Sequence, residues 1–392
     1  MAASTVVTTW RQDWLNTLSD MSESGRYTTL TYRIAFANLQ GMGVDLARKL
    51  LDVVGSEQRF FDMNEKELRM LTRGRSKIYR DDYRRDCLQR AVAEEAFVQE
   101  HGISATYYTD DAYPRRLLEA PDAPALIYTL GKCNLESPHV ISVVGTRHAT
   151  QYGTRFCDTL IGELAQRLPD LVVVSGLAYG IDIAAHRAAL KHGVTTVAVL
   201  PRGLNRIYPA MHRPDAIAIV KGGGMLLTDY TSQDMVQKSN FLARNRIVAA
   251  LSDCTVIVES AGSGGALVTA SLAMSYNRDV MAVPGRCGDE FSTGCNKLIS
   301  TNKAALITGA DDLMAAMRWE GAGRDPKPLD LFSDLTDEER AVVDVIRQHG
   351  EIHLNTLADT LRLPVYKLMS TLVELDCKNV IATLPGCRYT VI

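Results

Sequence analysis

Hydrophobic residues follow two different periods along the chain. Over residues 29–105, apolar residues recur three and four positions apart, which is typical of amphipathic helices, and we predict a small all-helical domain there. Between Pro138 and Thr308 short β-branched runs alternate with helical segments; the runs are VISVVG, LVVVSG, TTVAVL, AIAIV, CTVIVES, DVMAVPG and ALIT. Strands that are apolar on both faces and separated by helices indicate a parallel sheet covered on both sides. We therefore predict a doubly wound α/β domain over residues 106–317.

The segments outside these two domains have less regular patterns. Residues 1–28 are rich in Ser and Thr, and we expect a poorly ordered extension in which the spacing of Trp10, Trp14 and Leu18 suits a short helix. Residues 318–334 hold Pro, Gly and charge without a period, which predicts a linker.

Residues 335–392 have the pattern of a winged helix. Thr336 and Glu339 form a capping box that opens a first helix, Gly350 turns the chain, two further helical segments follow, and VIATLPGCRYTVI predicts a hairpin. This segment holds six Lys or Arg against eight Asp or Glu. We therefore expect protein contact or regulation there rather than reading of a DNA groove.

Composition and charge limit the class of protein. The chain has 392 residues, a formal net charge of -3 and 46% hydrophobic residues, as in an ordinary globular protein. No run of about 18 apolar residues exists to cross a bilayer, and the start lacks the features of a secretory signal, so we expect a cytoplasmic protein. Eight cysteines occur without a CxxC pair or a histidine at zinc-ligand spacing, which predicts reduced thiols and no zinc site. We expect the protein to hold neither a metal nor a cofactor.

Three polar or glycine-rich loops follow strand-like runs, and we expect them to form one anion site. The carboxyl ends of parallel strands share a crevice, glycine lets the backbone approach a ligand, and uncapped helix amides favour a phosphate. The alternative is that the glycines only permit tight turns between strand and helix. The candidate residues are Gly145, Thr146 and Arg147 in the first loop, Ser175 and Gly176 in the second, and Ser263, Gly264 and Gly265 in the third.

The segment KSNFLARNRIVAALS concentrates positive charge around one phenylalanine. We predict that Arg244, Asn245 and Arg246 begin a helix. Cations at the positive end of a helix dipole are unfavourable unless a nearby anion offsets their charge. Lys238 and these arginines suit phosphates, and the Phe241 ring suits stacking on a base of any type, which indicates a groove for single-stranded nucleic acid. The alternatives are that Phe241 anchors the core and that Arg246 forms a buried salt bridge with an acid such as Asp253 or Glu259.

Signals for enzyme chemistry are weak. The chain has no GxxxxGK[ST] loop, and Ser175 does not lie in a GxSxG elbow. Asp182 and His186 are explained as an acid in a first helical turn and a packing histidine. His349 and His353 are separated by Gly350, which argues against a metal pair.

The strings VVGTR, VVSGLAYGIDIAAHRAAL, NFLARNRIVAALS, SGGALVTAS, AVPG and TGCNKLI together resemble the DprA (Smf) family of DNA processing proteins over residues 113–312. The resemblance implies an extended Rossmann-like domain that binds single-stranded DNA without sequence preference, forms a homodimer, and helps load the recombinase RecA during natural transformation. It implies phosphate contacts for Arg147 and Lys238 and base contact for Phe241. It also places Ser175, Gly176, Arg244 and Asn245 in the same pocket.

Some positions depart from the family pattern. VGTR stands for the commoner VGSR, and Phe241 is followed by Leu242 where the family usually has proline. In the helical domain, residues 39–43 resemble a helix-hairpin-helix turn or a sterile-alpha-motif-like domain, whose amides suit a DNA phosphate. The interleaved charges of residues 73–86 fit a solvated helical face.

A related group, the lysine-decarboxylase-like phosphoribohydrolases that bind nucleoside monophosphates, is the alternative. That group carries PGGxGTxxE with a catalytic glutamate, whereas this chain has ESAGSGGALVTA, without an acid after the glycines. The sequence therefore favours binding over hydrolysis.

Overall fold

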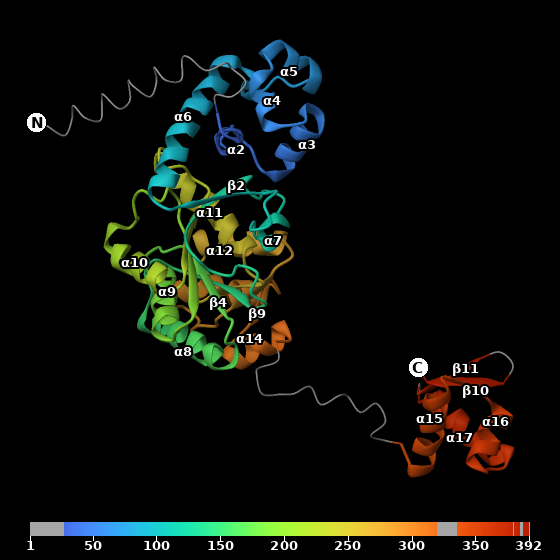
Figure 1. Ribbon diagram of the computed structural model, residues 1–392. Helices are drawn as coiled ribbons and strands as arrows, with labels where there is room; N and C mark the ends of the chain where they lie inside the picture. Colours follow the sequence, from blue (N-terminus) through green and yellow to red (C-terminus); the bar gives the residue numbers. More distant parts are fainter. Residues whose placement is uncertain (1–26, 320–334, 379, 385–386, 392) are drawn as a thin grey trace, which may run out of the picture. The chain divides into compact units, whose positions relative to one another are not determined.

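The computed structural model describes residues 27–319, 335–378, 380–384 and 387–391 (Figure 1). The chain divides into two compact units, residues 1–321 and 322–392. Most of the expected extension, including Trp10, Trp14 and Leu18, and most of the expected linker lie outside the described residues.

The larger unit begins with the predicted helices. Phe36 and Phe60 are fully buried among them and meet edge to face with ring centroids 5.2 Å apart. The same hydrophobic cluster continues into the sheet, so helices and sheet share a core. The helices are α2 (Thr29–Ala37), α3 (Val44–Val54), α4 (Glu57–Asp62), α5 (Glu65–Thr72), the short 3-10 turn η2 (Lys77–Tyr79) and α6 (Asp81–Glu100).

A nine-stranded sheet follows, with the order β1-β2-β6-β5-β4-β3-β7-β8-β9. Neighbours from β6 to β9 in this order are parallel, as predicted, whereas β2 pairs antiparallel with both β1 and β6. The strands are β1 (Ser104–Tyr107), β2 (Leu126–Gly131), β3 (Val140–Val144), β4 (Val172–Ser175), β5 (Thr195–Val199), β6 (Met225–Thr228), β7 (Cys254–Ile257), β8 (Asp279–Ala282) and β9 (Ala305–Leu306).

The run AIAIV is a helix and not a strand, which corrects the sequence analysis. It lies in α10 (Arg213–Lys221), where Ala216 and Ile219, three positions apart, are the buried residues. Pro214 near the start of the helix supports this outcome because its fixed φ suits a first helical turn. A short apolar run does not by itself distinguish a strand from a helix.

Helices cover both faces of the sheet, as Figure 1 shows. Val173 packs with α8 and α9, whereas its neighbours Val172 and Val174 point to the opposite face, which α11 and α12 cover. Such alternation in a central strand explains why these runs are apolar throughout. The helices are α7 (Arg115–Leu118), α8 (Gln151–Arg167), α9 (Ile181–Lys191), η3 (Ala210–His212), α11 (Lys238–Ala250), α12 (Gly265–Ser275), η4 (Glu290–Ser292), α13 (Thr293–Ser300) and α14 (Ala310–Met317).

The strand order reverses at β3, which fixes where a ligand can enter. The chain passes from β3 through β4 and β5 to β6 on one side, then crosses to β7, β8 and β9 on the other. Loops that leave β3 and β7 therefore diverge toward opposite faces and leave a crevice at the carboxyl ends of these two strands.

The smaller unit has three helices and a three-stranded antiparallel sheet of order β10-β12-β11. The expected capping box of Thr336 and Glu339 is present, Gly350 turns the chain with φ +70°, and the expected hairpin forms. The elements are α15 (Asp337–His349), β10 (Glu351–His353), α16 (Leu354–Leu361), α17 (Val365–Cys377), β11 (Ile381–Leu384) and β12 (Arg388–Val391).

Two global expectations can be compared with the described residues. None of the described helices is long and apolar enough to cross a membrane. The seven cysteines whose side chains are described are all free thiols, and four of them are buried.

Candidate nucleic-acid interface

A cavity of about 540 Å³ lies at the reversal of the strand order, and we call it the switch-point cavity. It is lined by the loops after β3, β4, β5 and β7 and by the first turns of α9, α11 and α12. Ten of the thirteen candidate residues line it, namely Gly145, Thr146, Arg147, Lys238, Phe241, Arg244, Asn245, Ser263, Gly264 and Gly265. The structure does not bring Ser175, Gly176 or Arg246 to its wall.

Arg147 and Phe241 meet on the wall of this cavity although they are far apart in sequence. The Arg147 guanidinium carbon lies 5.3 Å from the centroid of the Phe241 ring, and Arg147 is exposed. Phe241 is half-buried and contacts Tyr208 edge to face at 5.4 Å, so it is not sealed in the core. A cation and an aromatic ring are therefore available side by side.

The helix α11 begins at Lys238, six residues before Arg244, which corrects the expected start at Arg244. The charge in its first turn is therefore the exposed Lys238, with no acid beside it and no side chain capping the turn. Arg244 lies in the second turn. A cation at the positive end of a helix is unfavourable by itself, and an anion in the cavity offsets that cost.

The amino end of α12 also opens into the cavity. Its N-cap residue, Gly264, makes no side-chain cap, and a Cβ at that position would meet no atom within 4 Å. Gly264 and Gly265 are exposed. Here glycine leaves open space beside unpaired helix amides, as the sequence analysis proposed for an anion.

The buried carboxylate of Glu259 holds the loop that carries Arg147. Its Oε1 accepts a hydrogen bond from the Thr150 hydroxyl at 2.6 Å and its Oε2 accepts one from the Thr150 amide at 2.9 Å. The Glu259 carbonyl also accepts a hydrogen bond from the Thr146 amide at 2.7 Å. Glu259 thus fixes both ends of residues 146–150, and Arg147 is presented by an anchored loop.

The second loop reaches the cavity through Ala178, and the nearby carboxylate of Asp182 already interacts with its amides. Amides of Gly176 and Ala178 donate to the carboxylate of the buried Asp182. The first amide of α9, that of Ile181, donates to the Thr146 carbonyl at 3.1 Å. Burial raises the pKa of Asp182, against the opposing effect of the nearby Arg244 charge.

Gly176 and Ser175 serve packing beneath the cavity. A Cβ at Gly176 would overlap the guanidinium of Arg244, so glycine is needed for that arginine and not for a phosphate. The buried Ser175 hydroxyl donates to the Val143 carbonyl at 2.7 Å. Arg244 is itself buried, and its Nη1 donates to the Val199 carbonyl at 2.6 Å, so it lines the floor of the cavity.

Arg246 points away from the cavity and forms an ion pair. Its Nη2 lies 2.7 Å from Asp229, and its other terminal nitrogen donates to the Asp122 carbonyl. The alternative that Arg246 forms a salt bridge is therefore confirmed, but the acid is Asp229. Asp253, one of the acids suggested, pairs with Arg116 instead.

Other sequence expectations can be placed in the same way. His186 is fully buried, its Nδ1 lies 2.7 Å from the Thr196 hydroxyl, and burial lowers its pKa to about 3, as fits a packing histidine. The turn at residues 39–43 packs against the sheet part, because the amide of Val44 donates to Ala123.

Several residues of the cavity were missed by sequence reasoning, among them two with aromatic rings. Tyr208 lines it from the loop that follows β5, and His148 lines it beside Arg147. The rule that the carboxyl ends of parallel strands converge applies to the β5 loop as well and would have found Tyr208.

No cluster of three or more metal-ligating side chains occurs among the residues that the structure describes. The first turn of α12, where a phosphoribohydrolase would carry its glutamate, holds no acid.

The fold and the cavity define a doubly wound α/β protein with a basic, aromatic-lined crevice at its switch point. A family model described as DNA recombination-mediator protein A matches residues 104–318, and the chain belongs to this family, the DprA (Smf) family of DNA processing proteins.

Individual relatives agree with this assignment. The chain is 38% identical to the DNA processing protein DprA of Streptococcus pneumoniae over 212 residues, covering 54% of this chain and 73% of the relative. It is 32% identical to protein Smf of Escherichia coli over 282 residues, covering 70% and 74%. The X-ray structure of the Streptococcus pneumoniae protein covers 74% of this chain and 98% of that chain, with 29% identity and a TM-score of 0.61.

Proposed function

We propose that this chain binds single-stranded DNA in the switch-point cavity and acts without catalysis as a recombination mediator. The observation that carries the proposal is the pairing of Arg147 with Phe241, 5.3 Å apart on the cavity wall. The guanidinium suits a phosphate and the ring suits a base. Lys238 and the open amides of α12 add further groups for phosphates.

A single strand fits these groups better than a duplex. Phe241 has an accessible ring within a cavity, and a ring of this kind stacks on a base only when that base is unpaired and unstacked. The phosphate groups of the site carry no sequence information, and base stacking tolerates every base. We therefore expect binding without sequence preference.

We further propose that the protein acts in the cytoplasm as a homodimer through its α/β domain. In this role it protects incoming DNA and helps load RecA during natural transformation. Membership in a family of recombination mediators supports this proposal. The measurement is RecA filament formation on single strands that are already coated by a single-strand-binding protein. A failure to stimulate RecA would remove the partner and leave DNA binding intact.

For the smaller unit, we propose a winged helix that contacts protein. Its helix α17 exposes apolar side chains, with Tyr366 at 79%, Val373 at 57% and Met369 at 41%. A helix that reads a DNA groove is expected to present cations and polar groups instead.

DNA binding is tested by fluorescence anisotropy with an oligothymidylate and with a duplex of equal length. We expect tighter binding of the single strand and a weaker affinity for Arg147→Ala and for Lys238→Ala. Lys221→Ala is the matched control, because Lys221 is an exposed cation at the end of α10, near the amino ends of the strands. Wild-type affinity in both cavity variants would overturn the proposal.

A further inference from the structure

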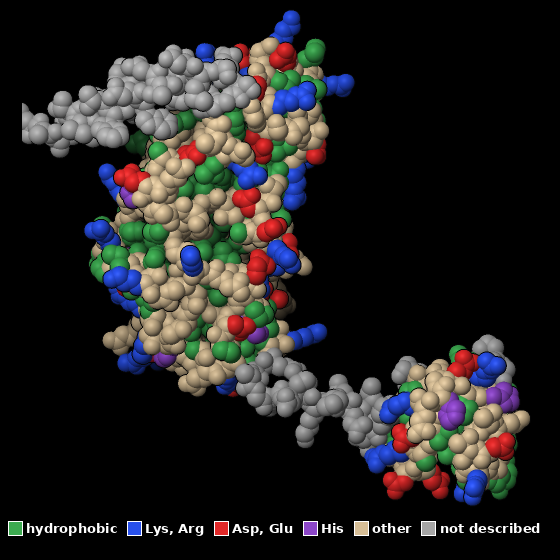
Figure 2. Space-filling model, in the orientation of Figure 1, with side chains coloured by type: hydrophobic (Ala, Val, Ile, Leu, Met, Phe, Trp, Pro, Cys, Tyr) green, Lys and Arg blue, Asp and Glu red, His purple; other side chains and the backbone are tan. Residues whose placement is uncertain are grey.

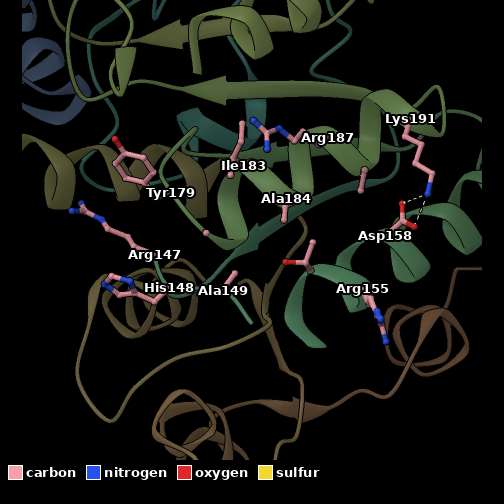
Figure 3. A pocket seen from close by; sticks show the side chains of 13 residues that line it. Arg147, His148, Ala149, Arg155, Asp158, Tyr179, Ile183, Ala184, Arg187 and Lys191 are labelled. Atoms are coloured by element: carbon pink, nitrogen blue, oxygen red, sulfur yellow. Dashed lines mark hydrogen bonds and ion pairs between the residues drawn. The ribbon is translucent and has the colours of Figure 1, made fainter. Parts of the chain in front are cut away.

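A second cavity, which we call the helix-pair cavity, lies between α8 and α9 and also has a volume of about 540 Å³. Figure 3 shows Arg147 and Tyr179 at one end and Lys191 with Asp158 at the other, with Ala149 and Ala184 between them. Its floor is therefore apolar and its rim is charged. Tyr179, 42% exposed, adds an aromatic ring at the end nearest Arg147.

Positive charge exceeds negative charge around this cavity. Four cations line it, Arg147, Arg155, Arg187 and Lys191, against a single carboxylate, Asp158. Lys191 Nζ is 2.7 Å from Asp158, and Arg187 Nε is 2.8 Å from Asp215, which lies on α10.

Two of the four cations have no carboxylate partner among the residues that the structure describes. Within the described part of the chain, Arg147 and Arg155 make no ion pair, and Arg155 is exposed on α8 with its guanidinium turned away from Asp158 in Figure 3. Figure 2 shows Lys and Arg side chains along the side of the larger unit that α8, α9 and α10 occupy. Unneutralised cations along one face attract a polyanion.

The two cavities are contiguous. Arg147 and His148 line both of them, because the anchored loop after β3 forms the wall between the two. A ligand that contacts Arg147 in the switch-point cavity is therefore already at the mouth of the helix-pair cavity.

We propose that the helix-pair cavity is a second segment of the nucleic-acid path, which takes the phosphates and unpaired bases of the same single strand after it passes Arg147. This inference rests on the proposed function. Arg155 and Lys191 contact phosphates along the rim, and Tyr179 with the apolar floor receives bases. A short strand fills the switch-point cavity alone, whereas a longer strand also occupies the second segment.

The test compares oligothymidylates of about 6 and about 16 nucleotides, a range typical of single-strand sites. Each lost phosphate contact is expected to weaken binding about fourfold at 0.15 M salt and to reduce the salt slope by about 0.7. The double variant Arg155→Ala with Lys191→Ala is therefore expected to bind the long strand about 15-fold more weakly and the short strand unchanged.

A further variant is expected to change the affinity for the long strand in the opposite direction. Asp158→Asn removes the carboxylate that neutralises Lys191, so it should tighten binding of the long strand only, a gain that structural damage does not produce. Arg167→Ala is the matched control, since Arg167 lies on the same helix, pairs with Asp311 and is outside both cavities.

The possible outcomes separate the two proposals. Selective loss of long-strand affinity in the double variant, with a gain in Asp158→Asn, supports the second segment. Wild-type affinity of the double variant for both lengths would overturn it and leave the proposed function standing. Absence of binding of either length by the wild-type protein would overturn both.

Discussion

Replacing Phe241 by alanine removes an aromatic ring from the switch-point cavity while every positive charge stays in place. In the free protein this ring lies beneath the guanidinium of Arg147 and against the edge of Tyr208. A base that stacks on Phe241 therefore takes a position next to the cation that binds its phosphate. The substitution therefore measures the contribution of base stacking to binding separately from the contribution of the positive charges.

The expected magnitudes follow from general values for base stacking and for phosphate contacts. Stacking of one base on an aromatic side chain contributes about 1–3 kcal/mol, so Phe241→Ala should weaken Kd about 5- to 150-fold. The salt slope should stay within about 0.3 of wild type, because no phosphate contact is removed. Arg147→Ala is expected to weaken binding about fourfold at 0.15 M salt and to reduce the slope by about 0.7.

The two side chains should also be coupled. A cation over an aromatic ring at an exposed site is worth about 0.5–1 kcal/mol, and here it holds the guanidinium in place. The double variant of Arg147 and Phe241 should therefore lose about 0.5–1 kcal/mol less binding free energy than the sum of the single variants.

The assay is an anisotropy titration of a labelled oligothymidylate between about 50 and 200 mM salt. Phe241→Tyr keeps a ring and should bind nearly as wild type. Phe97→Ala is the matched control, because Phe97 is also half-buried but lies on α6 and does not line the cavity. If Phe241→Ala flattens the salt slope as much as Arg147→Ala does, the ring only positions the cation and the stacking argument is refuted.

Three further predictions concern stability. In a urea titration, Gly176→Ala should lower the free energy of unfolding by about 1–3 kcal/mol, because the added methyl group would overlap Arg244. In the same titration, Gly264→Ala should change the free energy of unfolding by less than about 0.5 kcal/mol, because Gly264 lies in open space. Arg246→Ala should lower the free energy of unfolding by about 3 kcal/mol, because it breaks a largely buried ion pair. The same variant should leave the salt slope of oligonucleotide binding unchanged. A reduced salt slope would contradict the placement of Arg246 outside the cavity. Burial lowers the pKa of His186 from 6.5 to about 3, so the unfolded chain takes up this proton first. The contribution of His186 to the free energy of unfolding is therefore fully present above about pH 6.5 and is lost as the pH drops toward 3. His186→Gln should show a shallower fall of Tm over that range, and an equal fall would assign acid sensitivity to other groups.

The sequence anticipated most of the larger unit for one physical reason. Central parallel strands are buried on both faces, so their apolar runs are continuous and easy to recognise. The exceptions follow from the same reasoning. AIAIV in α10 is as apolar as a strand but is too short for its period to distinguish a strand from a helix. The strand β2 joins the sheet antiparallel, between β1 and β6, and β6 is far away in sequence.

The site was anticipated at the level of loops and less well at the level of side chains. Strand ends converge by topology, so Arg147 and Gly264 could be placed in one cavity without coordinates. The start of α11 at Lys238 was missed because no capping side chain marks it.

The sequence by itself determined the alternation of strands and helices, the convergence of the loops, and the cations and ring available to a nucleic acid. Only the tertiary structure decided which of those groups remain free. Arg246 is neutralised by Asp229, and the amides after Ser175 are occupied by Asp182, whereas Arg147 and Lys238 have no carboxylate partner among the described residues. The groups that pair with these cations and amides come from separate strands and helices. Because hydrogen bonds and ion pairs act only over short distances, which groups pair depends on how close the fold brings them.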